Sequence, residues 1–389
     1  MHAPVTGTDF PFCARLLGRS TTTARTHPIL VETPRAPSAP ETVAPPSGIP
    51  GEVRSQVRQW ARAAQRHAEP DTRRSLTQLL TTAVPLAGLW AAMMLTVDGA
   101  YWATLLLSVL AAAFTVRLFI IQHDCGHHSF FRSRRLNDLV GNLIGVVTLT
   151  PHGYWRRSHN VHHATCGDLQ KRGIGDVSVL TVAEYLKLPR WRRIAYRIYR
   201  NPAVMLGIGP AYLFIIKYRL PLDLIRDHRR TLIGVMGTNI AIAGLLTGLG
   251  LGFGFLDVLM VQAPIVLLSS AAGVWMFYVQ HQFERTYWRD HRNWDFYEAS
   301  VMGSSFYDLP QPLRWFSGNI GLHHIHHLSS RIPNYRLGTC LAEIPALRTV
   351  NRLGLRESLA CFRLALWDEA AERLISFKAL RQRRQTSSA

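Results

Sequence analysis

Residues 99–128 read GAYWATLLLSVLAAAFTVRLFIIQHDCGHH and join a long apolar run directly to a cluster of histidines. The part from 99 to 116 carries no charged side chain. A helix of about 18–20 apolar residues is long enough to cross the hydrocarbon core of a bilayer. A buried helix of a soluble protein would show polar residues every few positions, so this run predicts a membrane-spanning helix that ends in histidines.

Three more uncharged runs of similar length follow the same pattern. They cover residues 76–97, 231–256 and 258–280, and single aspartates, Asp98 and Asp257, separate the runs within each pair. Each pair predicts a tight helical hairpin. The expected fold is therefore an all-α integral membrane protein with four transmembrane helices in two hairpins.

The basic residues predict the orientation of these hairpins. The chain has 44 Lys and Arg against 25 Asp and Glu, a net charge of +19, yet none of the 44 lies between Arg74 and Arg117 or between Arg230 and Arg285. The positive-inside rule then places both termini and the histidine clusters in the cytoplasm. Such a surface suits anionic lipid headgroups, and nucleic acid is disfavoured because no recognised binding motif is present.

The remaining segments divide the chain into three regions. Residues 1–70 predict a disordered, proline-rich tail, with nine of the 21 prolines in the first 50 residues, and the start of a cytoplasmic helix. Residues 71–341 form the membrane domain, and 342–389 predict a basic amphipathic helix over 356–384 with a loose tail. Two weaker apolar stretches, 139–155 and 202–216, predict interfacial helices.

Ten of the 17 histidines fall into three short clusters, at 123–128, 159–163 and 323–327. The second and third each contain His-x-x-His-His, whose positions i, i+3 and i+4 share one face of a helix. Neutral imidazoles that converge in this way suit Zn, Fe, Cu or Ni, and eight nitrogens exceed what one ion takes. A closed zinc site usually includes cysteine, and the His-Glu-x-x-His of zinc peptidases is absent. Two imidazole-bound irons beside a membrane favour O₂ activation and oxidation of a hydrocarbon.

The motifs HDCGHH, SHNVHH and GLHHIHHLSSRIPNY resemble the three histidine boxes of the membrane fatty acid desaturases. The flanking text WRRSHNVHHATCGDLQKRGIGD, YVQHQFERTYW and GSSFYDLP is similar as well, most of all to the acyl-lipid omega-6 (delta-12) branch and its bacterial relatives. The likeness covers roughly residues 73–341. It implies a helical membrane fold whose cytoplasmic cap holds two irons. With O₂ and two electrons, these remove two hydrogens from adjacent methylenes of a fatty acyl chain.

The resemblance also implies a set of metal ligands. It comprises His123, His127, His159, His162, His163, His281, His323, His326 and His327. Beside these, His128, His324, Asp124 and Asp168 are candidates for residues that orient the ligands, as are Asp176 and Glu284. For the acidic residues, helix capping or plain solvation stays an open alternative. Trp155 and Trp275 line an acyl tunnel or belong to an interfacial aromatic belt.

Several functional alternatives remain open at this point. Hydroxylases and ketolases with similar boxes insert oxygen instead of removing hydrogen, and the histidines do not separate these outcomes. A metal transporter is disfavoured because its polar ligands would lie within the spans. The substrate is a membrane lipid or an acyl thioester. Electrons are expected from a separate donor, ferredoxin or cytochrome b5.

The predicted topology is testable with an accessible tag in each hairpin turn. Because all 44 basic residues avoid the hairpins, tags near Gly99 and near Gly254 should be labelled from the extracytoplasmic side. The measurement is labelling of intact cells with a membrane-impermeant reagent, with a C-terminal tag as the protected control. Cytoplasmic labelling at either turn contradicts the orientation.

Overall fold

The structure, a computed structural model, describes residues 50–220 and 229–386, so residues 1–49 of the region predicted over 1–70 as a proline-rich tail and the start of a helix lie outside the described residues. In the described part, four helices are long and apolar enough to cross a membrane. They are α3 (Thr72–Thr96), α4 (Tyr101–Gly126), α10 (Arg229–Phe253) and α11 (Phe255–His281). The prediction of four spans in two hairpins is confirmed.

The spanning helices differ in how much protein surrounds them. α4 packs against both α3 and α11 and is the most buried of the four. The other three direct large apolar side chains outward, for example Leu95, Ile240 and Leu251, each more than 70% exposed. Exposure of an apolar surface of this extent to water would be unfavourable, which agrees with a lipid environment around the hairpins.

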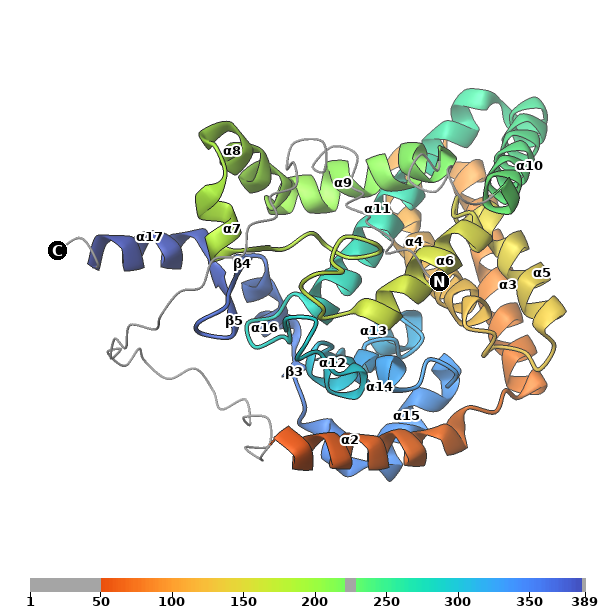
Figure 1. The fold of residues 1–389 in the computed structure, drawn as a ribbon. Helices are drawn as coiled ribbons and strands as arrows, with labels where there is room; N and C mark the ends of the chain where they lie inside the picture. Colours follow the sequence, from red (N-terminus) through yellow and green to blue (C-terminus); the bar gives the residue numbers. More distant parts are fainter. Residues whose placement is uncertain (1–49, 221–228, 387–389) are drawn as a thin grey trace.

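A second group of helices lies outside the four spans. Its helices are α2 (Pro50–Ala64), α5 (Arg134–Val147), α6 (His152–Thr165), α7 (Val182–Lys187), α8 (Arg190–Tyr199), α12 (Phe296–Met302), α13 (Gln311–Phe316), α14 (His323–Leu328), α15 (Asn334–Glu343), α16 (Leu355–Cys361) and α17 (Phe377–Thr386). Those around α2, α12, α14 and α15 form a cap at one end of the spans (Figure 1). Short 3₁₀ segments are η1 (Gln65–His67), η4 (Lys217–Arg219) and η5 (Pro345–Arg348).

The core of the cap lies beneath the third histidine cluster. α2 runs along its base, below α14 and α15 (Figure 1). Ile325, Leu337 and Leu347 are fully buried there, together with residues of α2 and α12. This packing fixes the short helix α14, which six residues alone would not stabilise.

Two small sheets make the fold mostly helical rather than purely α. β1 (Leu180–Thr181) pairs in parallel with β4 (Leu364–Asp368), which pairs antiparallel with β5 (Arg373–Ser376). In the second sheet, β2 (Phe306–Tyr307) pairs in parallel with β3 (Arg352–Leu353). Both sheets join segments that are far apart in the sequence, and so tie the C-terminal region to the rest of the cap.

The prediction of one amphipathic helix over 356–384 is wrong. That segment folds as α16, β4, β5 and α17. Leu366 and Ile375 of the hairpin are buried against Tyr185 and Tyr196, and the Tyr196 hydroxyl donates a hydrogen bond to the carbonyl of Ala365 at 2.6 Å. Strand formation depends on such side-chain packing, which overrides the helical pattern of the local sequence.

The two weaker apolar stretches have different structures. The stretch at 139–155 is interrupted at Pro151, which caps the start of α6, so it is divided between α5 and α6. The stretch at 202–216 forms the π-helical segments η2 (Val204–Ile208) and η3 (Tyr212–Ile216), joined by α9 (Gly209–Ala211). It packs along α11 and exposes Ile208 and Ile216. Its interfacial position stays a prediction.

Candidate metal centre

The structure brings all nine predicted histidines together in two groups that could each hold a metal ion. The first group contains His123, His127, His159, His163 and His326, and the second contains His162, His281, His323 and His327. Within each group one ring nitrogen per residue lies within 4.8 Å of all the others. Both His-x-x-His-His motifs therefore contribute to both groups.

Helix geometry explains this division. His159 and His163 are one turn apart on α6 and face the first group, whereas His162, about 60° round the helix from His159 and about 100° from His163, faces the second. On α14 the arrangement is reversed, because His323 and His327 face the second group. Two spanning helices complete the groups at the ends that are predicted to face the cytoplasm. α4 provides His123 and α11 provides His281.

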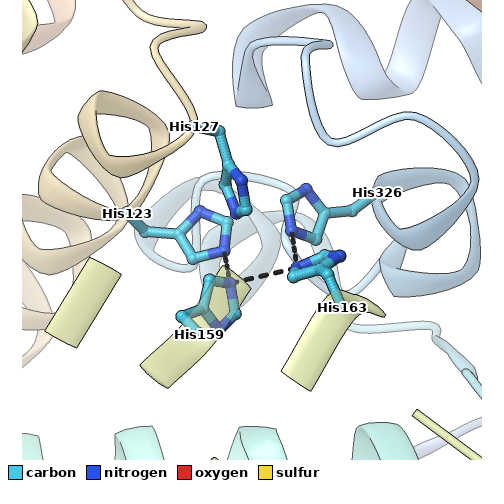
Figure 2. Close-up of side chains that lie close together, drawn as sticks. All are labelled: His123, His127, His159, His163 and His326. Atoms are coloured by element: carbon cyan, nitrogen blue, oxygen red, sulfur yellow. Dashed lines mark hydrogen bonds between the residues drawn. The ribbon is translucent and has the colours of Figure 1, made fainter. Parts of the chain in front are cut away.

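In the first group the Nε2 atoms follow one another at close range (Figure 2). The His123 and His159 Nε2 atoms are 3.0 Å apart, those of His159 and His163 are 3.1 Å apart, and those of His163 and His326 are 3.1 Å apart. In the second group, His281 Nε2 lies 3.1 Å from His162 Nε2 and 3.0 Å from His323 Nε2.

In two of the rings, the hydrogen bond made by Nδ1 shows that Nε2, the nitrogen facing the group, is the acceptor. His281 Nδ1 donates to the carbonyl of Gly303 at 2.9 Å, and His162 Nδ1 donates to the Asp176 carboxylate. A neutral imidazole has one N–H, so the Nε2 atoms of these two rings carry lone pairs directed at each other. Two acceptors at 3.1 Å repel unless a cation lies between them. Nitrogens about 2.0–2.1 Å from a shared tetrahedral ion lie roughly 3.4 Å apart, so the spacing fits a metal.

Burial keeps these rings in the form that binds metal. Desolvation, followed by the charges of neighbouring imidazoles, holds the pKa of six of the histidines well below the ordinary value for histidine; the six are His127, His159, His163, His323, His326 and His327. They are therefore neutral at pH 7, and each has a free lone pair for a cation. The residues present fit two metal ions.

A buried hydrogen-bond chain orients His123. Asp124 Oδ1 accepts from His123 Nδ1 at 3.2 Å, and Asp124 Oδ2 accepts from the backbone and side-chain amides of Asn334 at 2.7 and 2.8 Å. Gln78 of α3 donates to Asn334 Oδ1 at 3.0 Å. Asp124 thus has the orienting position predicted for it. Asn334 and Gln78 were not predicted, because both are distant in sequence from His123 and nothing in their local sequence relates them to it.

Asp176 orients His162 in the same way, through a loop that only glycine permits. Gly175 has φ +73°, and a Cβ atom there would lie 2.9 Å from the Ser158 carbonyl oxygen and 3.0 Å from the Cβ atom of His162. The loop therefore passes close against α6, which brings the neighbouring carboxylate to the imidazole.

The other predicted orienting residues contact different partners. Asp168 accepts from His291 Nδ1 at 2.7 Å, and Glu284 pairs with Arg373. His128 contacts Asp138, which was not predicted and which also binds Arg156.

His324 also lies outside both groups. Its Nε2 donates to the Leu347 carbonyl at 2.9 Å, and burial lowers its pKa to about 4. It anchors α14 to the cap core rather than facing a metal group.

An apolar cavity of about 250 Å³ opens beside the histidines. Its walls come from α4, α6, α11 and the segment before α10, and include Phe119, Trp155, Val266 and Phe277. His123 of the first group and His323 of the second line the same cavity. Trp155 is therefore a wall residue, which is one of the two roles left open for it by the sequence. Trp275 is not in the lining; it packs on Phe362, with ring centroids 4.1 Å apart.

Comparison with known proteins agrees with this geometry. The family model for fatty acid desaturases matches residues 100–356. The chain belongs to the fatty acid desaturase family. A fatty acid desaturase of Bacillus subtilis is 44% identical over 329 residues, which cover 85% of this chain and 93% of the relative.

More distant desaturases match a little over half of the chain. An sn-1 oleoyl-lipid 12-desaturase of Synechocystis is 26% identical over 56% of this chain and 62% of its own length. A chloroplastic omega-3 fatty acid desaturase of Glycine max is 31% identical over 57% of this chain and 49% of its own length. The predicted resemblance to this family is confirmed.

Replacing two neighbouring histidines of this desaturase should separate a metal-facing ring from a structural one. His326→Ala removes a nitrogen from the first group, and we expect loss of at least half of the bound metal. His324→Ala should keep the metal but lower the free energy of unfolding by about 1–3 kcal/mol, because the buried Leu347 carbonyl loses its donor. Metal analysis and thermal unfolding of both purified variants provide the readouts. Full metal content in the His326 variant contradicts the grouping.

Proposed function

We propose that this chain is a di-iron desaturase that introduces a cis double bond into a fatty acyl chain, using O₂ and two electrons. The observation that carries the proposal is the shared wall between the apolar cavity and both histidine groups, through His123 and His323. An acyl chain in this cavity lies beside both groups. The overall reaction consumes O₂, two electrons and two protons, converts –CH₂–CH₂– to –CH=CH–, and releases two water molecules.

In this proposal the histidines and the residues that orient them have separate roles. The nine histidines would hold two irons, which supply the O₂-activating and hydrogen-abstracting chemistry when bound. Iron suits the all-imidazole donor set, and fatty acyl oxidation needs a redox-active metal, which zinc is not. Asp124, Asp176 and the Gly303 carbonyl accept hydrogen bonds from the Nδ1 atoms of His123, His162 and His281. These bonds fix the direction in which the Nε2 lone pairs of the three rings point.

The cavity walls determine which methylenes react. Phe119, Trp155 and Phe277 give an acyl chain an apolar surface and exclude water from the reacting carbon atoms. Removal of two hydrogens instead of insertion of oxygen requires that two adjacent carbons are held beside the metal groups. The rigid helices α4 and α11 support such a position.

The electron source is a separate protein. Relatives are named as ferredoxin-dependent in Nostoc and as cytochrome b5-dependent in Arabidopsis thaliana. For this chain we propose a separate donor of one of these two kinds, ferredoxin or cytochrome b5. The cap with the histidines, and with it the docking site of the donor, is proposed to face the cytoplasm.

Product analysis tests the proposed reaction. Expression in a host with saturated lipids should yield acyl chains that are lighter by two hydrogens, with about two irons per purified chain. The measurements are mass spectrometry of total lipids and metal analysis, with the His326→Ala variant as the inactive control. A product heavier by one oxygen would assign hydroxylation, and full activity with zinc alone would exclude the di-iron mechanism.

A narrowed cavity should change the substrate range without disturbing the metal groups. Gly273 of α11 lines the cavity, and nothing lies within 4 Å of a Cβ atom built there. Gly273→Leu should therefore fold normally but fill the space of a few methylenes, so that activity on long chains falls while iron content is unchanged.

The matched control is Gly248→Leu on α10, where a Cβ atom also meets nothing within 4 Å and the residue is exposed. Acyl-chain profiles of both variants, normalised to iron, give the comparison. Equal profiles for both variants would contradict the assignment of the cavity to the acyl chain.

A further inference from the structure

A basic groove lies at the cap end of α3 and α4 and contains a buried arginine. Its lining comprises Asp71, Arg73, Arg74, Thr77, Gln78, Thr81, Arg117, Trp315 and Tyr335. Three arginines face one carboxylate there, an excess of two positive charges. In the described structure, this groove and the acyl cavity have no lining residue in common.

Arg117 is the unusual member of this set. It belongs to the spanning helix α4 and is only 7% exposed. Its Nε donates to Thr82 Oγ1 at 3.2 Å, and its guanidinium donates to the Trp315 carbonyl and stacks 3.8 Å above the Trp315 ring. Among residues 50–220 and 229–386, no carboxylate is paired with it. A cation at membrane depth is costly without a counter-charge, and such residues typically mark binding sites.

The surroundings of the groove are those of a lipid headgroup region. α3 carries polar residues on the groove side through its first turns, where Thr81 Oγ1 donates to the Thr77 carbonyl at 2.7 Å. Trp315, 41% exposed, has the amphipathic character of residues at membrane interfaces. Leu76, Leu80 and Leu313 nearby are each 45–59% exposed, which provides an apolar surface next to the charged one.

From this combination we infer that the groove binds the phosphate of an anionic membrane phospholipid, as a site separate from the acyl cavity. Arginine binds phosphate oxygens through paired N–H donors, and Arg73, Arg74 and Arg117 supply the charge. The exposed leucines receive the acyl chains, a contact that inorganic phosphate cannot make. The negative charge of the lipid offsets the excess positive charge and neutralises the buried Arg117.

The site is also connected to the first histidine group. Gln78 lines the groove and donates to Asn334, which in turn binds Asp124 beside His123. A lipid that holds the start of α3 in place therefore also supports the residues that orient His123.

The test uses the full-length protein in phosphatidylcholine nanodiscs with a minor fraction of phosphatidylglycerol, and counts retained lipids by native mass spectrometry. Arg73→Gln/Arg74→Gln changes two exposed residues and leaves Arg117, which also supports Trp315, intact. Each arginine removed should weaken phosphatidylglycerol retention about fivefold. The matched control is Arg62→Gln in α2 combined with Arg66→Gln in η1, which removes the same charge from exposed positions outside the groove.

The site is supported if the unmodified protein and the control variant retain phosphatidylglycerol in preference to phosphatidylcholine and the groove variant loses this preference. An equal loss in both variants, or equal retention of both lipids by the unmodified protein, would overturn it. Inorganic phosphate added to the detergent-solubilised protein separates the two sources of the ligand. Complete displacement of phosphatidylglycerol at matched concentration would assign a free-phosphate site and reject the lipid.

Discussion

The mutual proximity of nine imidazoles is the constraint on which the rest of this structure depends. Ring nitrogens within the two groups lie 3.0–3.3 Å apart, and in His162 and His281, whose opposite nitrogens donate to protein acceptors, the inward nitrogens present lone pairs to each other. Such an arrangement is unfavourable in the absence of cations. The protein stabilises it by packing the helices that carry the rings, by giving His123, His162 and His281 a hydrogen-bond acceptor, and by burial, which keeps the six rings with lowered pKa values unprotonated.

This constraint explains the division of the molecule into spans and cap. α4 and α11 deliver His123 and His281 at their cap ends, and α6 and α14 approach from the cap. The small sheets and the core under α14 hold these helices in position, because none of the short cap helices would be stable alone. The same helices α4 and α11 form the walls of the apolar cavity, so metal groups and cavity share their supports.

Two sides of α4 therefore have different roles in our proposals. The side with Phe119 and His123 faces the cavity and the histidines, whereas Arg117 faces α3 and Trp315. A hydrogen-bond chain through Gln78, Asn334 and Asp124 links the second side to the first. In these proposals α4 therefore contributes to the acyl cavity, to the metal groups and to the lipid groove.

Much of this organisation could be predicted from local sequence. Uncharged runs define spans because any charge in the hydrocarbon core is costly, and the spacing i, i+3, i+4 defines a shared helix face. These two rules predicted the four spans and the convergence of the histidines. The C-terminal hairpin could not be predicted in this way, since β4 and β5 depend on contacts with Tyr185 and Tyr196 from a distant segment.

The sequence by itself determined that histidines from three clusters and the end of α11 meet beside a membrane. Only the tertiary structure decided how they divide, with His162 separated from His159 and His163, and His326 from His323 and His327. A helix fixes the relative directions of its own side chains but not the position of the helices opposite them. The packing of α4, α6, α11 and α14 sets that position, and with it the roles of Asn334 and Asp176.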